Sequence, residues 1–244
     1  MKTKNLLSSI MCNTGKIAML IDPDKITNYK LLVDKLQKAS DSGIDYIFVG
    51  GSYCETNKFK ETVIAIKKNC NLPIILFPGD KNQVSDQADA LLYLSLLSGR
   101  NPKYLIEQHV ESAFEINALE IEILPTGYIL IEGGSETSVA KISETRPIEN
   151  DNVELALKTS LAGIHQGKKI IYFDAGSGAK KSVNNTLIKE YKKLSNVPLI
   201  VGGGINTTKK IIDLKKLGVN IIVVGNHLEN NDLFFDEIKK INMF

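Results

Sequence analysis

Short apolar runs rich in Ile, Val and Leu recur along the whole chain, and longer amphipathic stretches separate them. Such runs are typical of parallel strands that are buried on both faces, and the amphipathic stretches are typical of the helices that connect such strands. We identify eight runs within 244 residues, and a (β/α)8 barrel needs roughly 250. We therefore predict that residues 1–244 form a single TIM-barrel domain of the α/β class. A two-domain doubly wound fold is the alternative.

The order of the expected elements follows from these runs. The predicted strands lie at residues 17–22, 44–49, 73–77, 89–94, 119–131, 169–174, 198–202 and 220–225. We expect Pro125 to interrupt the fifth strand. The predicted helices lie at residues 27–41, 56–69, 101–117, 151–166, 182–194, 207–216 and 231–241. Residues 80–87 show a weak helical pattern that a turn or loop explains equally well. Residues 133–149 contain Gly, Ser, Thr and Pro with little periodicity, so we expect a long, mobile loop over the barrel mouth.

The composition excludes several classes of function. The chain has 30 basic and 28 acidic residues and a net charge of +2, so a nucleic-acid partner is not expected. The cysteines, Cys12, Cys54 and Cys70, are odd in number and form no Cys-x-x-Cys pair, which argues against a disulfide framework. No apolar run is long enough to span a membrane, and residues 1–10 lack the apolar core of a signal peptide. We expect a soluble, cytoplasmic protein.

Small or polar residues follow every predicted strand. Because the active sites of TIM barrels lie at the C-terminal ends of the strands, these residues are the candidates for chemistry. In chain order they are Asp22-Pro23-Asp24, Gly50-Gly51-Ser52, Pro78-Gly79, Ser98-Gly99-Arg100-Asn101, Glu132-Gly133-Gly134, Asp174-Ala175-Gly176-Ser177-Gly178, Gly202-Gly203-Gly204 and Gly225-Asn226.

The glycines after the last three predicted strands indicate a phosphate site. Glycine lets backbone N–H groups approach an anion closely, and a following helix adds free N–H groups and the positive end of its dipole. TIM barrels frequently hold phosphate at the loops after strands seven and eight. Here Gly203 and Gly204 follow the seventh strand, and Gly225 and Asn226 follow the eighth. Tight turns without a ligand are the alternative.

Two carboxylates after the first predicted strand indicate a cation site. Mg²⁺ prefers oxygen ligands and keeps waters and substrate phosphates in its shell, so one or two carboxylates are enough to hold it. We favour Asp22 over Asp24 as the ligand, and Ser52 could add its hydroxyl group from the neighbouring strand end. The alternative is that Asp24 caps a helix while Asp22 binds no metal.

Asp174 directly follows the sixth apolar run and precedes the Gly-Ser-Gly turn. Its charge would repel a phosphate bound nearby, so a purely structural purpose does not explain it. We predict that Asp174 is a general base for a nearby hydroxyl group. The histidines, His109, His165 and His227, show no metal-ligand spacing and receive no role.

Taken in this order, the motifs resemble the geranylgeranylglyceryl phosphate synthase family over nearly the whole chain. The matching segments are residues 21–25 (IDPDK), 49–52 (VGGS), 77–79 (FPG), 98–102 (SGRNP), 125–128 (PTGY), 172–178 (YFDAGSG), 202–205 (GGGI) and 224–226 (VGN).

The resemblance implies a prenyltransferase that needs Mg²⁺. It would join a prenyl diphosphate, with geranylgeranyl diphosphate as the expected donor, to the 3-hydroxyl group of sn-glycerol 1-phosphate and release diphosphate. The product would be an ether-lipid precursor. Asp22 and Ser52 match the family's metal-binding positions. The positions that match its glycerol-phosphate site are Tyr172, Phe173, Asp174, Ala175, Gly176, Ser177, Gly178, Gly203, Gly204, Gly225 and Asn226.

The chain departs from the family pattern at two positions. Asp174 stands where many relatives carry Glu, which shortens the reach of the expected base. Leu20 stands where some relatives carry a basic residue, so the chain resembles the other branch of the family. The resemblance also implies a homo-oligomer that touches membranes only transiently to collect its donor. Candidates for the groove that holds the donor chain are Tyr93, Leu94, Leu96, Leu97, Tyr104, Ile129 and Ile131. For each of them, ordinary packing in the barrel or helix core is the alternative.

Two other functions share part of this pattern. A sugar-phosphate isomerase, epimerase or aldolase would use the same two phosphate loops. Such an enzyme usually needs a lysine or a second acid inside the barrel, and the nearest lysine, Lys25, lies beyond the Asp-Pro-Asp turn. A non-catalytic phosphate-binding protein is the third possibility. The joint presence of Asp22, Ser52 and Asp174 argues against it.

Overall fold

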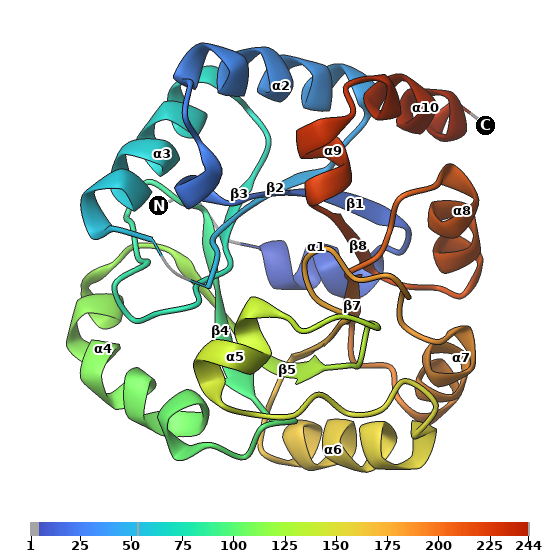
Figure 1. Ribbon diagram of the computed structural model, residues 1–244. Coiled ribbons are helices and arrows are strands. Elements are labelled where there is room, and N and C mark those ends of the chain that lie inside the picture. Colours follow the sequence, from blue (N-terminus) through green and yellow to red (C-terminus); the bar gives the residue numbers. More distant parts are fainter. Residues whose placement is uncertain (1–4, 53, 244) are drawn as a thin grey trace.

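The computed structural model describes residues 5–52 and 54–243, and its strands close into a parallel barrel in chain order (Figure 1). The strands are β1 (Lys16–Ile21), β2 (Tyr46–Val49), β3 (Ile74–Leu76), β4 (Ala90–Leu96), β5 (Glu122–Leu130), β6 (Ile170–Asp174), β7 (Leu199–Gly202) and β8 (Ile221–Val224). Each strand pairs with the next, and β1 pairs with β8. The predicted TIM barrel is therefore confirmed, and the doubly wound alternative is wrong.

Helices surround the barrel on the outside (Figure 1). The α-helices are α1 (Leu6–Cys12), α2 (Tyr29–Ser42), α3 (Thr56–Asn69), α4 (Gln108–Ala118), α5 (Ser138–Ser143), α6 (Val153–His165), α7 (Asn185–Leu194), α8 (Thr208–Lys216), α9 (Asn226–Asn230) and α10 (Leu233–Asn242). A short 3-10 helix, η1 (Pro23–Lys25), follows β1, and a π-helical turn, η2 (Lys103–Glu107), leads into α4. No helix in the described part of the chain is both long and apolar enough to cross a membrane.

Side chains alternate between two apolar cores. In β6, Tyr172 points into the barrel, where it belongs to the inner core, whereas Ile171 and Phe173 belong to the core between the barrel and its helices. In β5, Tyr128 points inward and Ile129 points outward in the same way. This alternation is the period of two expected of a strand, and it decides which residues can reach the active site.

Two parts of the structure differ from the expected loops. Residues 133–149 were expected to form a loop, but they contain α5, which begins after Thr137 because its side chain accepts a hydrogen bond from the Ala140 N–H. The Tyr104 hydroxyl group donates to the Ile142 carbonyl and ties this helix to η2. Pro125 does not interrupt β5, since its carbonyl accepts a hydrogen bond from the Lys169 N–H of the β6 side.

The N-terminal segment forms a helix that the sequence analysis missed. Helix α1 lies at the end of the barrel opposite the active site (Figure 1), and Ile10 is buried in the inner core. The Glu122 carboxylate at the start of β5 accepts hydrogen bonds from the Leu6 and Leu7 N–H groups. The Asn220 side chain donates to the Ile10 carbonyl. The apolar spacing of Leu6, Leu7 and Ile10 was the available signal.

The remaining boundaries shift by only a few residues. Residues 80–87 form turns rather than a helix, as the weak pattern allowed. The helix expected at 182–194 begins at Asn185, because Asn184 caps it by accepting a hydrogen bond from the Thr186 N–H. Helix α9 lies in a segment where no helix was expected, and it brings Asn226 to the mouth of the barrel.

Candidate active site

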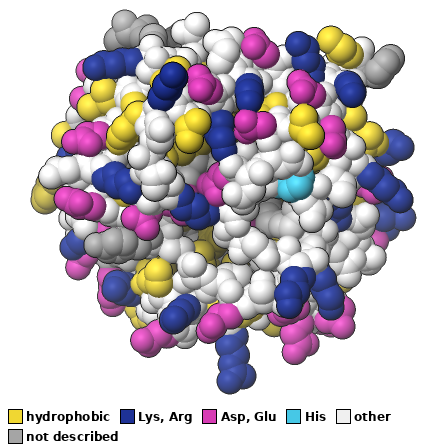
Figure 2. Space-filling model, turned by 45° about the horizontal axis from the view of Figure 1, so that its top comes forward, with side chains coloured by type: hydrophobic (Ala, Val, Ile, Leu, Met, Phe, Trp, Pro, Cys, Tyr) yellow, Lys and Arg dark blue, Asp and Glu magenta, His cyan; other side chains and the backbone are white. Residues whose placement is uncertain are grey.

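A cavity of about 720 Å³ opens at the C-terminal ends of the strands. Most of the residues proposed from the sequence line it, including Asp22, Ser52 and Asp174. A cavity of this size is typical of small-molecule sites. Figure 2 shows Lys, Arg, Asp and Glu side chains interspersed on the face that it draws, so this face presents no single-sign charged surface.

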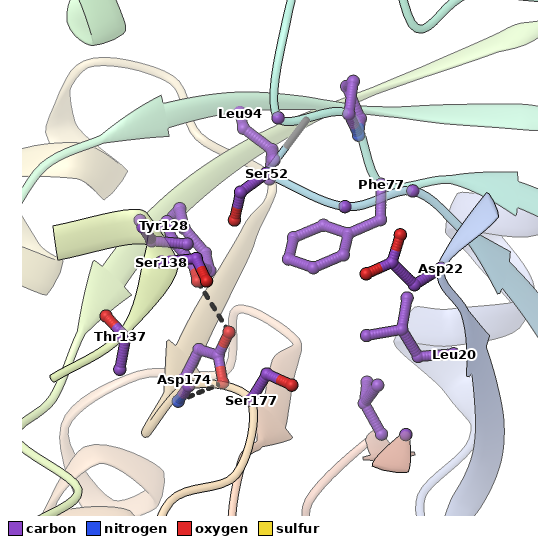
Figure 3. A pocket seen from close by; sticks show the side chains of 18 of the residues that line it. Leu20, Asp22, Ser52, Phe77, Leu94, Tyr128, Thr137, Ser138, Asp174 and Ser177 are labelled. Atoms are coloured by element: carbon purple, nitrogen blue, oxygen red, sulfur yellow. Dashed lines mark hydrogen bonds between the residues drawn. The ribbon is translucent and has the colours of Figure 1, made fainter. Parts of the chain in front are cut away.

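Asp174 ends β6 and is held by two hydrogen bonds (Figure 3). Its Oδ2 atom accepts from the Tyr128 hydroxyl group at 2.6 Å, and its Oδ1 atom accepts from the Gly176 N–H at 2.8 Å. The residue is only 7% exposed, yet it lines the cavity. Its carboxylate is therefore fixed in orientation, with its remaining lone pairs available to a ligand.

Burial controls the protonation of this pair. It raises the pKa of the Asp174 carboxyl group, while the hydrogen bonds from Tyr128 and Gly176 act to lower it. Burial also raises the pKa of Tyr128 well above its usual value, so the hydroxyl group stays protonated and keeps donating to Asp174. A carboxylate with a raised pKa is a stronger proton acceptor than an exposed one, as a general base requires.

Tyr128 is a candidate functional residue that the sequence analysis did not name as one. It lies in the quoted segment 125–128, but nothing in the sequence gives the inward phase of β5. Its ring packs edge-to-face on Tyr172 at 5.3 Å between ring centroids, and the Phe77 ring lies 5.8 Å from Tyr128 and 5.3 Å from Tyr172. These three rings line the cavity next to Asp174 and hold the Tyr128 hydroxyl group in place.

The glycine loops after β6 and β7 pack against each other. Gly203 has a φ of 84°, and a Cβ atom there would lie 2.6 Å from the Gly176 N atom. Only glycine combines this left-handed backbone with so close an approach. Among the described residues, the N–H groups of Gly203, Gly204 and Gly225 have no hydrogen-bond partner in the chain. These free N–H groups line the cavity at the glycine loops (residues 176–178, 203–204 and 225–226) where the sequence predicts a phosphate cradle, and free N–H groups of this kind can bind an anion.

Asp22 and Ser52 line the same cavity from the ends of β1 and β2 (Figure 3). A Cβ atom on Gly51 would lie 2.5 Å from the Asp22 Oδ1 atom, so this glycine keeps the carboxylate open to the cavity. Burial raises the pKa of Asp22, while the charge of Lys25 acts to lower it. Asp22 caps η1 by accepting a hydrogen bond from the Asp24 N–H, and the Asp24 side chain is 60% exposed and lies 4.0 Å from Lys58. The capping role that the alternative gave to Asp24 is therefore wrong, and metal binding at Asp22 stays a prediction.

The described residues contain no cluster of three or more His, Cys, Asp or Glu side chains that could hold a metal by themselves. A metal at Asp22 would therefore need further oxygen ligands from Ser52, water or its substrate. This matches Mg²⁺, which commonly binds through one or two carboxylates together with substrate phosphates. The open Asp22 carboxylate beside the Gly50-Gly51-Ser52 turn fits such a site.

The rest of the cavity is mainly apolar and lies between β4 on one side and η2, α4 and α5 on the other. Four of the predicted groove residues line it: Tyr93, Leu94, Leu96 and Tyr104. Leu97, Ile129 and Ile131 do not, because they belong to the core between the barrel and its helices. The structure adds apolar lining residues that the sequence analysis did not propose for the groove: Phe77, Val84, Leu92, Ile116, Val139 and Ile142.

His109 and His227 also lie at the cavity wall, and both have local partners. The His109 ring stacks on Tyr93 at 4.0 Å between centroids and forms a 2.7 Å hydrogen bond with the Leu94 carbonyl. Burial lowers the pKa of His109, so the ring is neutral near neutral pH. His227 packs on Phe234.

Phe173 and Ala175 are the two predicted substrate-binding residues that do not line the cavity. Phe173 points outward and packs on Tyr191 of α7 at 5.4 Å between ring centroids. Ala175 is fully buried, and its N–H donates to the Gly202 carbonyl. The period of two along β6 explains the correction, since only Tyr172 and Asp174 can face the barrel axis. The other nine predicted positions line the cavity.

The placement of Phe173 predicts a loss of stability without a loss of binding. Phe173→Leu should lower the free energy of unfolding by about 1 kcal/mol, because it replaces a packed ring with a smaller side chain. The affinity for inorganic phosphate should be unchanged. Phe59→Leu, at another fully buried ring on α3, is the matched control. Denaturant unfolding measures the stability of both variants, and phosphate titration measures their affinity. If Phe173→Leu weakened phosphate binding and Phe59→Leu did not, the Phe173 ring would belong to the binding site.

Comparison with known proteins gives a consistent result. The pattern of the PcrB family matches residues 12–242. The geranylgeranylglyceryl phosphate synthase of Zunongwangia profunda is 43% identical over 93% of this chain and 96% of its own length.

Solved structures agree. The (S)-3-O-geranylgeranylglyceryl phosphate synthase of Thermoplasma acidophilum, in complex with its substrate sn-glycerol-1-phosphate, superposes with a TM-score of 0.90 at 29% identity, covering 99% of this chain and 97% of its own. The wild-type GGGPS of Thermoplasma volcanium gives a TM-score of 0.89 at 32% identity, covering 100% and 97%.

Proposed function

The chain belongs to the PcrB family of geranylgeranylglyceryl phosphate synthases, and on that premise we propose how its site carries out prenyl transfer. The protein is a prenyltransferase that joins geranylgeranyl diphosphate to the 3-hydroxyl group of sn-glycerol 1-phosphate. A C–O bond forms between the glycerol oxygen and the first prenyl carbon. The bond from that carbon to the diphosphate breaks, and the hydroxyl proton leaves. The product is an ether-lipid precursor.

One observation carries this proposal: a single cavity joins a phosphate cradle, a buried carboxylate and an apolar groove. The cradle suits the phosphate of the acceptor. The groove suits a prenyl chain, which an enzyme acting on small sugar phosphates has no need to hold. Asp174 lies between the two, beside Gly176 of the cradle and Tyr128 at the inner wall.

Asp174 takes the proton from the attacking hydroxyl group. The cradle fixes the acceptor through its phosphate, so its hydroxyl group is held near the carboxylate, and this positioning supplies much of the rate. Tyr128 donates to Oδ2 and Gly176 donates to Oδ1, which keeps the carboxylate from rotating away. The rings of Phe77, Tyr128 and Tyr172 border the same region, and their faces can stabilise positive charge on the allylic carbon.

Asp22 and Ser52 are the residues that would hold Mg²⁺ together with the diphosphate of the donor. When bound, Mg²⁺ neutralises the charge that develops on the departing diphosphate. The half-buried Asp22 carboxylate faces the cavity, and Gly51 leaves room beside it. Mg²⁺ dependence, a homo-oligomeric assembly and transient membrane contact complete the proposal. We further propose a cytoplasmic location, which three free cysteines support.

A transfer assay tests the proposed function. The purified protein is incubated with Mg²⁺, radiolabelled sn-glycerol 1-phosphate and prenyl diphosphates of several lengths, and the lipid phase is extracted. We expect label in the organic layer, with the geranylgeranyl donor giving the most, and none when Mg²⁺ is chelated. No label with any donor despite glycerol phosphate binding would favour a binding protein. No binding at all would favour a sugar-phosphate isomerase, epimerase or aldolase.

A further inference from the structure

Lys25 connects the two halves of the active site. It lies in η1 after β1, and its Nζ atom donates to the Asn226 Oδ1 atom at 2.7 Å, at the start of α9 after β8. The same Nζ atom lies 3.1 Å from a Glu229 carboxylate oxygen and 3.8 Å from Asp22 Oδ2. Two carboxylates therefore hold the ammonium group against Asn226, although the Lys25 side chain is 46% exposed.

These contacts determine which way the Asn226 amide points. A lysine ammonium group has three donors and no acceptor, so the Asn226 atom that faces it must be the amide oxygen. The Ser177 hydroxyl group also donates to this oxygen, at 3.0 Å. With two donors on one side, the opposite orientation would place the amide NH₂ group against the ammonium group. Lys25 therefore excludes the flipped amide.

The orientation sends the Asn226 NH₂ group toward the phosphate cradle. The Nδ2 atom lies 3.8 Å from the point where a Cβ atom on Gly178 would be. Among the described residues, Nδ2 donates no hydrogen bond within the chain, whereas Oδ1 accepts two. A flipped amide would instead aim its oxygen at the cradle and repel a phosphate.

We propose that Lys25 is a positioning residue that fixes the Asn226 amide so that its NH₂ group donates to the phosphate of the acceptor. This inference rests on the proposed function, because it assigns the phosphate to the cradle at Gly178 and Asn226. Lys25 acts through Asn226, and its charge is already balanced by Glu229 and Asp22. It links the cation side of the cavity at β1 to the phosphate side at β8.

Calorimetric titration of sn-glycerol 1-phosphate into the full-length protein, without Mg²⁺ or donor, tests this role. Lys25→Met should weaken binding about tenfold, the effect expected when a hydrogen bond to a charged group is lost. Lys25→Arg should restore most of the affinity, because it again presents only donors to Oδ1. Lys58→Met is the matched control: this lysine lies near the same turn but donates to the Asp24 carbonyl, and the affinity should not change.

A double-mutant cycle separates positioning from general structural support. Once Asn226→Ala has removed the amide, adding Lys25→Met should weaken binding no further. Additive losses, unchanged affinity in Lys25→Met, or an equal loss in Lys58→Met would each overturn the inference. If the unaltered protein does not bind sn-glycerol 1-phosphate, the proposed function fails by itself. Inorganic phosphate then replaces it as the probe, and the same cycle decides the role of Lys25.

Discussion

Asp174→Asn should lower the kcat of prenyl transfer by a factor of about 10²–10⁴, the range expected when a general base is removed, while the barrel should stay folded. The amide cannot accept the hydroxyl proton. It can still accept from the Gly176 N–H, and its NH₂ group can donate to the Tyr128 oxygen, so the local structure survives. The KM for glycerol phosphate should change little, because the cradle is intact. Steady-state kinetics of the purified variant checks both parameters.

The stability of this variant separates catalysis from folding. Burial raises the pKa of Asp174 in the folded protein, so the folded state binds a proton more tightly than the unfolded state does. The ionised Asp174 carboxylate therefore lowers the free energy of unfolding at neutral pH. This loss of stability develops as the pH rises from the pKa that Asp174 has in the unfolded state to the higher pKa that it has in the folded state. Asp174→Asn should consequently unfold at neutral pH no more easily than the natural protein. A clear loss of thermal stability would mean that misfolding explains the lost activity.

The pH profile provides a second test of Asp174. The base works only when it is ionised, so kcat should rise with pH through a pKa above that of an ordinary carboxyl group. Tyr128→Phe removes a hydrogen bond that lowers this pKa, so the rise should move to higher pH. In Asp174→Asn, the residual kcat should not increase with pH in this range. If the increase persisted in this variant, a group other than Asp174 would be the one that titrates.

We expect Asp22→Asn to remove most of the Mg²⁺-dependent turnover and to leave the fold intact. The substitution removes the negative charge that would hold the cation, whereas the amide oxygen can still accept from the Asp24 N–H and cap η1. Mutating a residue that only hydrogen-bonds to a metal ligand costs about 10–100-fold in metal affinity or activity. Removing a charged ligand itself is a larger change, so kcat/KM should fall by at least about 10²-fold. Raising the Mg²⁺ concentration should recover only part of the activity.

Asp24→Asn is the matched control for this prediction. Asp24 also lines the cavity, but its side chain is 60% exposed and lies 4.0 Å from Lys58. We expect it to keep most of its Mg²⁺-dependent turnover. Activity and Mg²⁺ titration of both variants check the assignment. If Asp22→Asn retained full activity, or if Asp24→Asn lost as much, the cation site would lie elsewhere.

The sequence by itself determined the barrel and the rim that carries its chemistry. Buried parallel strands leave near-continuous apolar runs, and each run ends where small or polar residues begin, so the strands, Asp22, Asp174 and the glycine loops could be located without coordinates. The sequence suggested glycine at position 203 for the approach of a phosphate, and the structure adds a second reason, the close approach of the Gly176 backbone.

Only the tertiary structure decided which side of each strand faces the site. An apolar run has the same composition on both faces, so the sequence did not show that Tyr128 points inward and Phe173 outward. It also did not place Lys25 beside Asn226, which lies 201 residues further along the chain. Closure of the barrel makes β1 and β8 neighbours, and contacts of this kind follow from the three-dimensional path of the chain, which local patterns do not encode.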